Sequence, residues 1–205
     1  MYKNWRLFLA EADDYDAELT DYFIQGQYKK ETSFFKKAKI AFDSLKKEFA
    51  IDNGNSLSMI YFKYSKFGRE SQDLKEHSYC SYIIQSKIII VDPKKLENIK
   101  NEEERKNLFV ENVLHEIRHF NQHMMWNSYS PDAKMKLSKV WTMPSSDPAE
   151  LKKLTWLKLV EWWVDNLDYN NRPHEKDAKS FANRNLQKAL SSVENIFLKK
   201  DIKKE

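Results

Sequence analysis

The residues best suited to carry chemistry lie in one short segment, His115-Glu116-Ile117-Arg118-His119, which has the pattern H-E-x-x-H. Side chains four residues apart on a helix share a face, with Cβ atoms about 5–6 Å apart, so two imidazoles can reach one tetrahedral Zn²⁺ at about 2.0–2.1 Å. Glu116 is rotated by about 100° from His115 and can reach a water molecule on the metal, where a general base is needed. The segment therefore predicts a zinc-binding helix in which Glu116 is the catalytic residue.

The helix that must present these histidines is predicted to run from Asn101 to about Trp126. Asn101 followed by Glu104 three residues later has the spacing of a capping box at its start. One face carries a continuous apolar stripe, formed by Phe109, Val113, Ile117, Phe120 and Met124. His115 and His119 lie on roughly the opposite side, which faces a cleft if they bind metal and solvent if they do not.

A catalytic zinc needs three protein ligands, and the candidates for the third are His123, His174, Glu175 and Asp177. His123 lies about 12 Å along the helix axis from His115, because each residue rises by about 1.5 Å, so one ion cannot bind both. We expect His123 to lie at the surface or to face a substrate. Glu175, in the first turn of the last predicted helix, is the preferred ligand. The alternative for Glu175 is a first-turn carboxylate that complements the helix dipole.

Other polar residues near these positions are candidates for supporting roles. A histidine that binds metal normally donates its other ring N–H to a carboxylate or a backbone carbonyl. Glu111, one turn before the first histidine, and Asp177 are the candidates, and each can instead be a simple surface carboxylate. Arg118, His123 and His174 are close enough in sequence to be tested as groups that contact the substrate or stabilise an oxyanion. The sequence does not choose among these three.

A family resemblance involves the same residues. The segment 115–119, followed by Glu175-Lys176-Asp177-Ala178-Lys179-Ser180-Phe181-Ala182, resembles the H-E-x-x-H … E-x-x-A-x-x-F-A signature of the ImmA/IrrE-type metallopeptidases. The two blocks cover a small part of the chain. The resemblance implies a small zincin-like fold, zinc held by the two histidines and Glu175, and Glu116 as the catalytic base. It also implies that the strands before the metal helix form the substrate-binding sheet.

The function predicted from these residues and this resemblance is zinc-dependent hydrolysis of a peptide bond in a protein substrate. By resemblance, a regulator in a phage or mobile element is a candidate substrate. An extended peptide can add to the edge of a sheet by main-chain hydrogen bonds. The second hypothesis is a zincin-fold protein that binds and inhibits or sequesters a host protein without cleaving it. The third is a nucleic-acid-associated protein whose H-E-x-x-H pattern is accidental.

The segments around this helix predict an α+β fold, predominantly helical, in a single domain over residues 1–205. A small antiparallel or mixed sheet is expected within 57–92. Its strands are predicted from β-branched and aromatic runs at 57–64, 79–84 and 88–91, of which the last two form a hairpin.

Helices are expected before and after the sheet. The expected helical regions are 1–50, with two helices; 101–126; a short helix after Ser130-Pro131; and 147–199, with two helices that begin at Asp147-Pro148 and near Pro173. A basic tail follows at 200–205. The clustered tryptophans Trp156, Trp162 and Trp163 are interpreted as core residues, because they have helical spacing.

Composition argues against several classes of protein, including nucleic-acid-binding, disulfide-bonded and membrane-spanning proteins. The 205 residues include 35 basic and 31 acidic ones, a net charge of +4, which makes nucleic acid an unlikely partner. The single cysteine, Cys80, excludes an internal disulfide and a cysteine-based zinc cluster. No apolar run reaches the roughly 20 residues of a membrane span, and the apolar stretch near the N-terminus is short for a signal peptide. We therefore expect a cytoplasmic protein.

Overall fold

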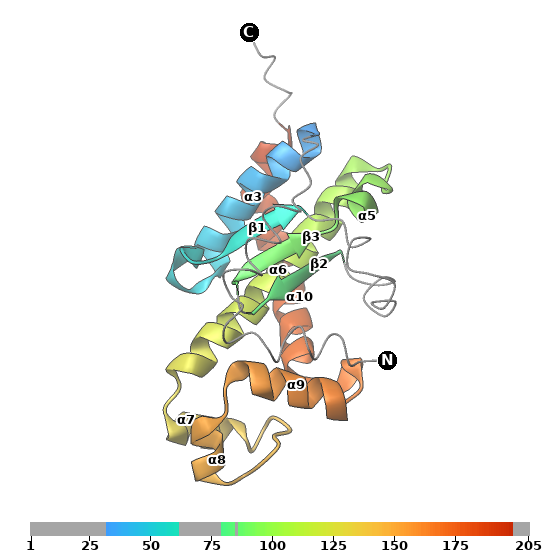
Figure 1. Cartoon of the computed structure of the whole chain (residues 1–205). Coiled ribbons are helices and arrows are strands. Elements are labelled where there is room, and N and C mark those ends of the chain that lie inside the picture. The colour runs from blue at the N-terminus through green and yellow to red at the C-terminus, as the bar shows by residue number, and fades with distance from the viewer. Residues whose placement is uncertain (1–31, 62–78, 85, 199–205) are drawn as a thin grey trace.

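The structure is a computed structural model, and it describes residues 32–61, 79–84 and 86–198 (Figure 1). The first helix expected within 1–50, the end of the first expected strand and the basic tail 200–205 lie outside the described residues. Among the helices in the described ranges, none combines the length and the apolar character that a membrane crossing requires.

The fold class is α+β and predominantly helical, as predicted. The elements, in chain order, are α3 (Ser33–Phe49), η1 (Ile51–Gly54), β1 (Ser58–Tyr61), β2 (Cys80–Ile83), β3 (Ile88–Val91), α5 (Pro93–Glu97), α6 (Glu102–Ser128), α7 (Pro131–Leu137), α8 (Pro148–Lys153), α9 (Trp156–Asn166), η3 (Tyr169–Asn171) and α10 (Pro173–Leu198). Helix α10 packs along α6 and α3, and β2 lies against α6 (Figure 1).

Helix α6 carries the H-E-x-x-H segment and begins where the sequence predicts. The side chain of Asn101 caps it by accepting hydrogen bonds from the backbone N–H groups of Glu103, at 2.9 Å, and Glu104, at 3.1 Å. The first turn is acidic, which complements the positive end of the helix dipole. The cap fixes the start of the helix, and the apolar stripe fixes its rotation against the core.

The sheet has three strands in the order β1-β3-β2 and is mixed. Strand β2 pairs antiparallel with β3, as the predicted hairpin requires, and β1 pairs parallel with β3. The N–H of Asp92 donates to the carbonyl of Tyr79, and Tyr82 lies opposite Ile89. Since hydrogen-bonded and non-hydrogen-bonded pairs alternate in an antiparallel ladder, the backbone groups of Tyr82 point away from β3. They face the outer edge of β2, on the side of α6.

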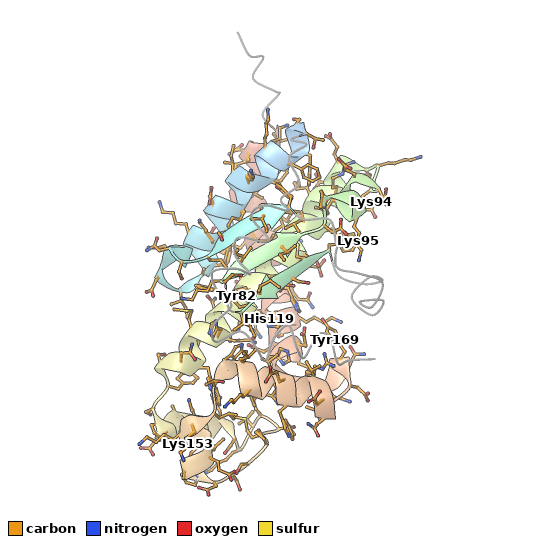
Figure 2. All side chains as sticks on the ribbon, viewed as in Figure 1. Tyr82, Lys94, Lys95, His119, Lys153 and Tyr169 are labelled. Carbon is orange, nitrogen blue, oxygen red and sulfur yellow. The ribbon has the colours of Figure 1, made fainter. Side chains whose placement is uncertain are left out.

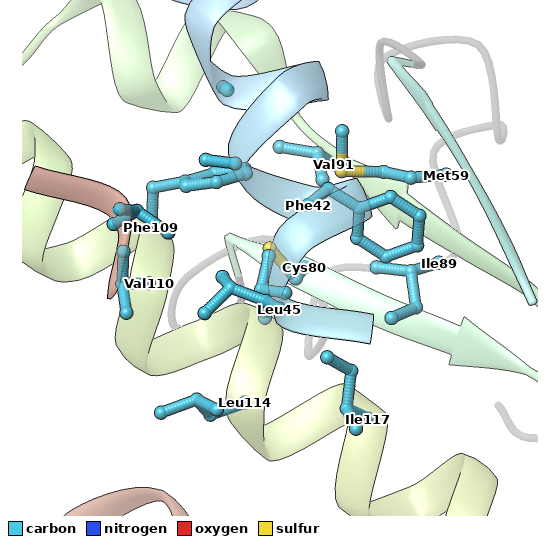
Figure 3. Close-up of a cluster of buried hydrophobic side chains, with 14 of the residues drawn as sticks. Phe42, Leu45, Met59, Cys80, Ile89, Val91, Phe109, Val110, Leu114 and Ile117 are labelled. Carbon is cyan, nitrogen blue, oxygen red and sulfur yellow. The ribbon is translucent and has the colours of Figure 1, made fainter. Parts of the chain in front are cut away.

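Two hydrophobic clusters organise the helices. The larger one, the sheet core, joins α3, the sheet, α6 and α10 and includes Phe42, Leu45, Met59, Cys80, Ile89, Val91, Phe109, Val110, Leu114 and Ile117 (Figure 3). The smaller one, the tryptophan core, consists of the buried residues Trp126, Trp156, Leu159 and Trp163 with partly buried neighbours from α7 to α9. Figure 1 shows α7, α8 and α9 gathered at the C-terminal end of α6, away from the sheet.

One predicted helix is in fact two. The sequence suggests a continuous helix from Asp147 through Trp163, but α8 ends at Lys153 and α9 begins at Trp156. Thr155 starts the second helix, because its hydroxyl accepts from the N–H of Lys158. The carbonyl of Leu154 leaves the helical pattern and accepts instead from the indole of Trp126, at 2.9 Å.

The other helix predictions in this part of the chain are confirmed. The short helix after Ser130-Pro131 is α7, which the hydroxyl of Ser130 caps. Helix α10 begins at Pro173, as expected. The interpretation of the tryptophans as core residues is confirmed for Trp156 and Trp163, which are buried, while Trp162 packs against them only partly buried.

Candidate metal centre

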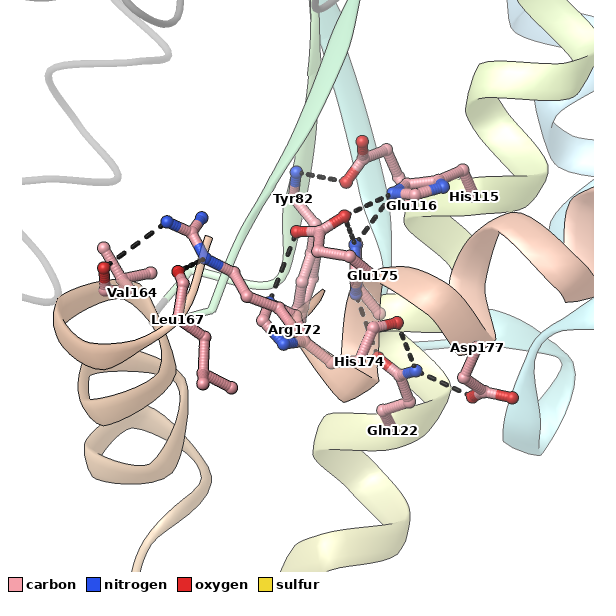
Figure 4. Close-up of polar contacts among 11 residues, drawn as sticks. Tyr82, His115, Glu116, Gln122, Val164, Leu167, Arg172, His174, Glu175 and Asp177 are labelled. Atoms are coloured by element: carbon pink, nitrogen blue, oxygen red, sulfur yellow. Dashed lines mark hydrogen bonds and ion pairs between the residues drawn. The ribbon is translucent and has the colours of Figure 1, made fainter. Parts of the chain in front are cut away.

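Helices α6 and α10 bring three ligand atoms together (Figure 4). The Nε2 atoms of His115 and His119 are 3.0 Å apart. The Oε2 atom of Glu175, in the first turn of α10, lies 3.1 Å from Nε2 of His115 and 3.4 Å from Nε2 of His119. All three atoms lie within 4.8 Å of one another, and the three side chains are half-buried. This group can hold a metal ion.

The ionisable groups of this cluster shift one another's pKa values. Burial alone would raise the pKa of Glu175, but the charge of His119 and hydrogen bonds from the surrounding histidines hold it well below its usual range. Burial alone would lower the pKa of His119, but the charge and hydrogen bond of Glu175 raise it to about 9. An ionised carboxylate therefore sits beside two imidazoles, and without a metal it holds a proton on His119.

Glu116 reaches from α6 to strand β2, at the edge of the described sheet. Its Oε2 atom accepts from the backbone N–H of Tyr82, at 2.8 Å. The side chain is buried, and burial raises its pKa, although the two histidines and this hydrogen bond act in the opposite direction. Figure 2 shows Tyr82 on β2 and His119 on the neighbouring α6. Glu116 is therefore a carboxylate disposed to accept a proton beside the candidate metal group.

Gln122 was not singled out from the sequence, yet it orients His119. Its Nε2 donates to Asp177, at 2.7 Å, and to the carbonyl of His174, at 3.0 Å. Both are acceptors, so the amide oxygen must face Nδ1 of His119, 2.9 Å away, and accept its proton. The Nε2 lone pair of His119 is thereby left for a cation. The signal was the position of Gln122 three residues after His119, on the same helix face.

Asp177 and Arg118 form an ion pair that contacts Gln122, the residue bonded to His119. The guanidinium of Arg118 donates to Asp177 at 2.7 Å and lies over the ring of Phe181. Asp177 was predicted to accept directly from a ligand histidine, but it reaches His119 through Gln122. Arg118, a candidate for contact with the substrate, is engaged in this pair.

Glu111 is not brought to the site. Within the described ranges, neither a hydrogen bond nor an ion pair joins it to His115, and it lines a shallow surface hollow near the start of α6. Among the described residues, no contact therefore supports Glu111 as the acceptor of a histidine N–H.

His123 lies outside the group of ligand atoms, as the rise of the helix requires. Its Nδ1 is 3.0 Å from the hydroxyl of Tyr82, and the two rings are in contact. Burial, with a contribution from the charge of Lys87, lowers the pKa of His123 to about 4. His123 is therefore a neutral imidazole beside the edge strand.

His174 is buried, with 4% of its surface exposed. Its ring stacks on Trp163, with centroids 4.9 Å apart and an interplanar angle of 13°. Its Nε2 lies 3.3 Å from Oε1 of Glu175. Burial lowers its pKa. The sequence offers His174 as a third metal ligand or as a group that contacts the substrate. Among the described residues, the group of ligand atoms does not include His174, and its burial opposes contact with a substrate. Its ring instead contacts the carboxylate of Glu175.

Comparisons with known proteins add no relatives. No family model matches the chain, no curated protein matches it, and no solved structure matches it. The resemblance to the ImmA/IrrE-type metallopeptidases therefore remains a prediction from two short blocks of sequence.

Proposed function

We propose that the protein is a zinc-dependent metallopeptidase. The observation that carries the proposal is the spacing of the three ligand atoms of His115, His119 and Glu175, which is 3.0, 3.1 and 3.4 Å. A tetrahedron with arms of about 2.0–2.1 Å has edges of about 3.3–3.4 Å. The three atoms therefore occupy nearly the corners of one face of a zinc tetrahedron.

The donor set favours zinc with a catalytic role. Two imidazole nitrogens and one carboxylate oxygen are ligands that zinc accepts, and three protein ligands leave a fourth position for water. Bound zinc lowers the pKa of such a water to about 7 and polarises a carbonyl group. A structural zinc site, by contrast, is closed by a fourth protein ligand.

Glu116 is proposed to act as the general base and then the general acid. Its buried carboxylate has a raised pKa and lies next to both histidines. One oxygen is held by the N–H of Tyr82, which fixes the side chain and leaves the other oxygen to take a proton from water. The same oxygen can return the proton to the leaving amine.

The edge of β2 supports a peptide as the substrate class. Its outward backbone groups lie on the side where Glu116 reaches Tyr82. The N–H of Tyr82 already donates to Glu116, so an extended peptide along this edge would use the outward carbonyl of Tyr82 as an acceptor. Such a peptide would have a carbonyl group beside Glu116. The proposed substrate is therefore an unfolded or extended segment of a protein.

The test is Glu116→Gln, with digestion of a peptide library read by mass spectrometry and zinc measured on the same samples. We expect activity to fall by about 10²–10⁴-fold, because the proton acceptor is lost, while zinc is retained. Glu104→Gln, at an exposed position on the same helix, is the matched control and should cleave as the wild type does. Cleavage by Glu116→Gln at the wild-type rate would refute the proposal. Zinc binding with no cleavage of any peptide would favour the non-catalytic binding protein.

A further inference from the structure

His174 stands where the tryptophan core meets the ligand carboxylate. Trp163 of α9 stacks on one face of its ring, and the ring of His119 lies close to it, with centroids 5.4 Å apart. Its backbone carbonyl is held by Gln122. With 4% of the residue exposed, the ring has little freedom to turn. His174 is therefore a fixed group next to Glu175.

The contacts of the ring determine which nitrogen of His174 carries the proton. Nδ1 is buried and has no hydrogen-bond partner among the described residues. Nε2 faces a carboxylate oxygen of Glu175 at 3.3 Å. A lone pair on Nε2 directed at this carboxylate oxygen would be repelled, whereas an N–H there is attracted to it. The proton therefore lies on Nε2 and is directed to Glu175.

The two oxygens of Glu175 consequently have different partners. Oε2 faces the Nε2 atoms of His115 and His119, whereas Oε1 faces His174. A carboxylate can bind a metal through one oxygen or through both. Coordination through both oxygens would fill the position that a catalytic zinc keeps open for water.

We propose that His174 is a positioning residue that holds Oε1 of Glu175 by its Nε2–H, so that Glu175 offers Oε2 alone to the metal. The fourth coordination position then stays open. The proposal rests on the proposed zinc site and concerns how that site keeps its geometry. Hydrogen bonds to ligating carboxylates are a general way of orienting a metal site.

The proposal also gives a role to the long segment between the second histidine and Glu175. Arg172, just before α10, ties the end of α9 to this turn by donating to the carbonyl of Leu167, at 3.2 Å. The indole of Trp163 donates to the carbonyl of Thr142. Figure 4 shows the contact from Arg172 to Leu167. Helix α9 is thus tied to the turn before α10 and to Thr142, and its Trp163 stacks on the ring beside Glu175.

The test uses three substitutions: His174→Gln, His174→Asn and His174→Phe. The amide of Gln can place a donor where Nε2 stands, whereas Asn is too short to reach Oε1 and Phe has no donor. Zinc affinity is measured by competition with a chelator, and the coordination number is read from the visible spectrum of the Co²⁺-substituted protein. We expect Phe and Asn to weaken zinc binding by about 10–100-fold and to shift the Co²⁺ spectrum to a higher coordination number, and Gln to stay close to wild type.

His123→Phe is the matched control for metal binding, since it makes the same change at a histidine outside the ligand group. If Phe prevents folding, the contrast between Gln and Asn decides. Wild-type affinity and spectrum in both Asn and Phe would overturn the proposal while leaving the zinc site intact. Complete loss of metal in all three variants would also overturn the proposal, because it would show that His174 is itself a metal ligand. Absence of zinc from the wild type would instead refute the proposed function.

Discussion

The sheet core and the tryptophan core meet α6 at different places, and they are built differently. Phe109 through Phe120 of α6 pack into the sheet core, whose buried residues are mainly aliphatic side chains and phenylalanines. Trp126, near the end of α6, belongs to the tryptophan core, whose indoles also donate hydrogen bonds to backbone carbonyls. The first cluster is held mainly by burial, with a buried hydrogen bond from the hydroxyl of Tyr61 to the carbonyl of Phe35. The second and smaller cluster has two hydrogen bonds from its indoles.

The candidate metal group lies where the two cores meet. The backbones that carry His115, His119 and Glu175 belong to α6 and α10, which the sheet core holds side by side. The ring that contacts the far oxygen of Glu175 is stacked on the tryptophan core. The sheet core therefore holds together the helices that carry the three candidate ligands, whereas the tryptophan core contacts the ring beside one of them.

The strongest test of this difference between the two cores is to truncate one large ring in each. Phe109→Ala and Trp163→Ala each remove a fully buried ring and should each cost about 3–5 kcal/mol of unfolding free energy, measured by denaturant titration. Zinc affinity should fall by about 10–100-fold in Trp163→Ala, because His174 loses its stacking partner. It should change little in Phe109→Ala. Equal losses of zinc affinity in the two variants would show that the tryptophan core has no special effect on the metal site.

Removing the amide that orients His119 should have the next largest effect. Gln122→Leu keeps the size of the side chain but leaves Nδ1 of His119 without its acceptor. We expect zinc affinity to fall by about 10–100-fold in chelator competition. Gln187→Leu, at an exposed position of α10, is the control and should bind zinc normally. Unchanged affinity in Gln122→Leu would mean that the amide does not set the protonation of His119.

The metal-free site should lose stability as the pH rises. Burial would lower the pKa of His119, but Glu175 raises it to about 9 in the folded protein, compared with an unfolded value of about 6.5. A group whose pKa is raised on folding stabilises the protein fully below the unfolded pKa and loses that contribution as pH rises through the folded pKa. The melting temperature of chelator-treated protein should therefore fall between about pH 6.5 and 9. Glu175→Gln should flatten this fall, and a fall of the same size in that variant would contradict the assignment.

The ion pair between Arg118 and Asp177 should have the smallest effect on stability and zinc affinity. Arg118 and Asp177 are partly exposed, at 23% and 25% of their side-chain surfaces, so solvent screens their attraction. Arg118→Ala should cost at most about 1 kcal/mol in denaturant titration. Zinc affinity should stay near the wild-type value, because Asp177 still accepts from Gln122. A loss as large as that expected for Gln122→Leu would place Arg118 within the machinery of the metal site.

Much of the fold could be predicted because its signals are local. The apolar period and the Asn101 cap define α6, and Pro173 marks the start of α10. The break at Thr155 was missed because the helical period runs through it, while its cause is a contact between Leu154 and the distant Trp126. The parallel pairing of β1 with β3 also depends on long-range packing, which the composition of the strands does not encode.

The candidate site also has features that the sequence predicts and features that depend on tertiary packing. The spacing of His115 and His119 predicts their convergence, and a first-turn carboxylate was enough to select Glu175. The role of Gln122 required the positions of Asp177 and of the His174 carbonyl on another helix. The hydrogen bond from Tyr82 to Glu116 likewise depends on which edge of the sheet faces α6. Such contacts between elements are set by tertiary packing, so residue spacing does not predict them.

The central claim is that His115, His119 and Glu175 hold one zinc ion between them, and metal stoichiometry tests it most directly. Wild-type protein, His119→Ala, Glu175→Ala and the control Glu104→Ala are purified, loaded with zinc and dialysed, and the metal is counted per chain. We expect about one zinc in the wild type and the control and little in the other two, with a melting temperature that falls on chelation only where zinc was bound. Equal zinc in all four proteins, or none in any, would contradict the claim.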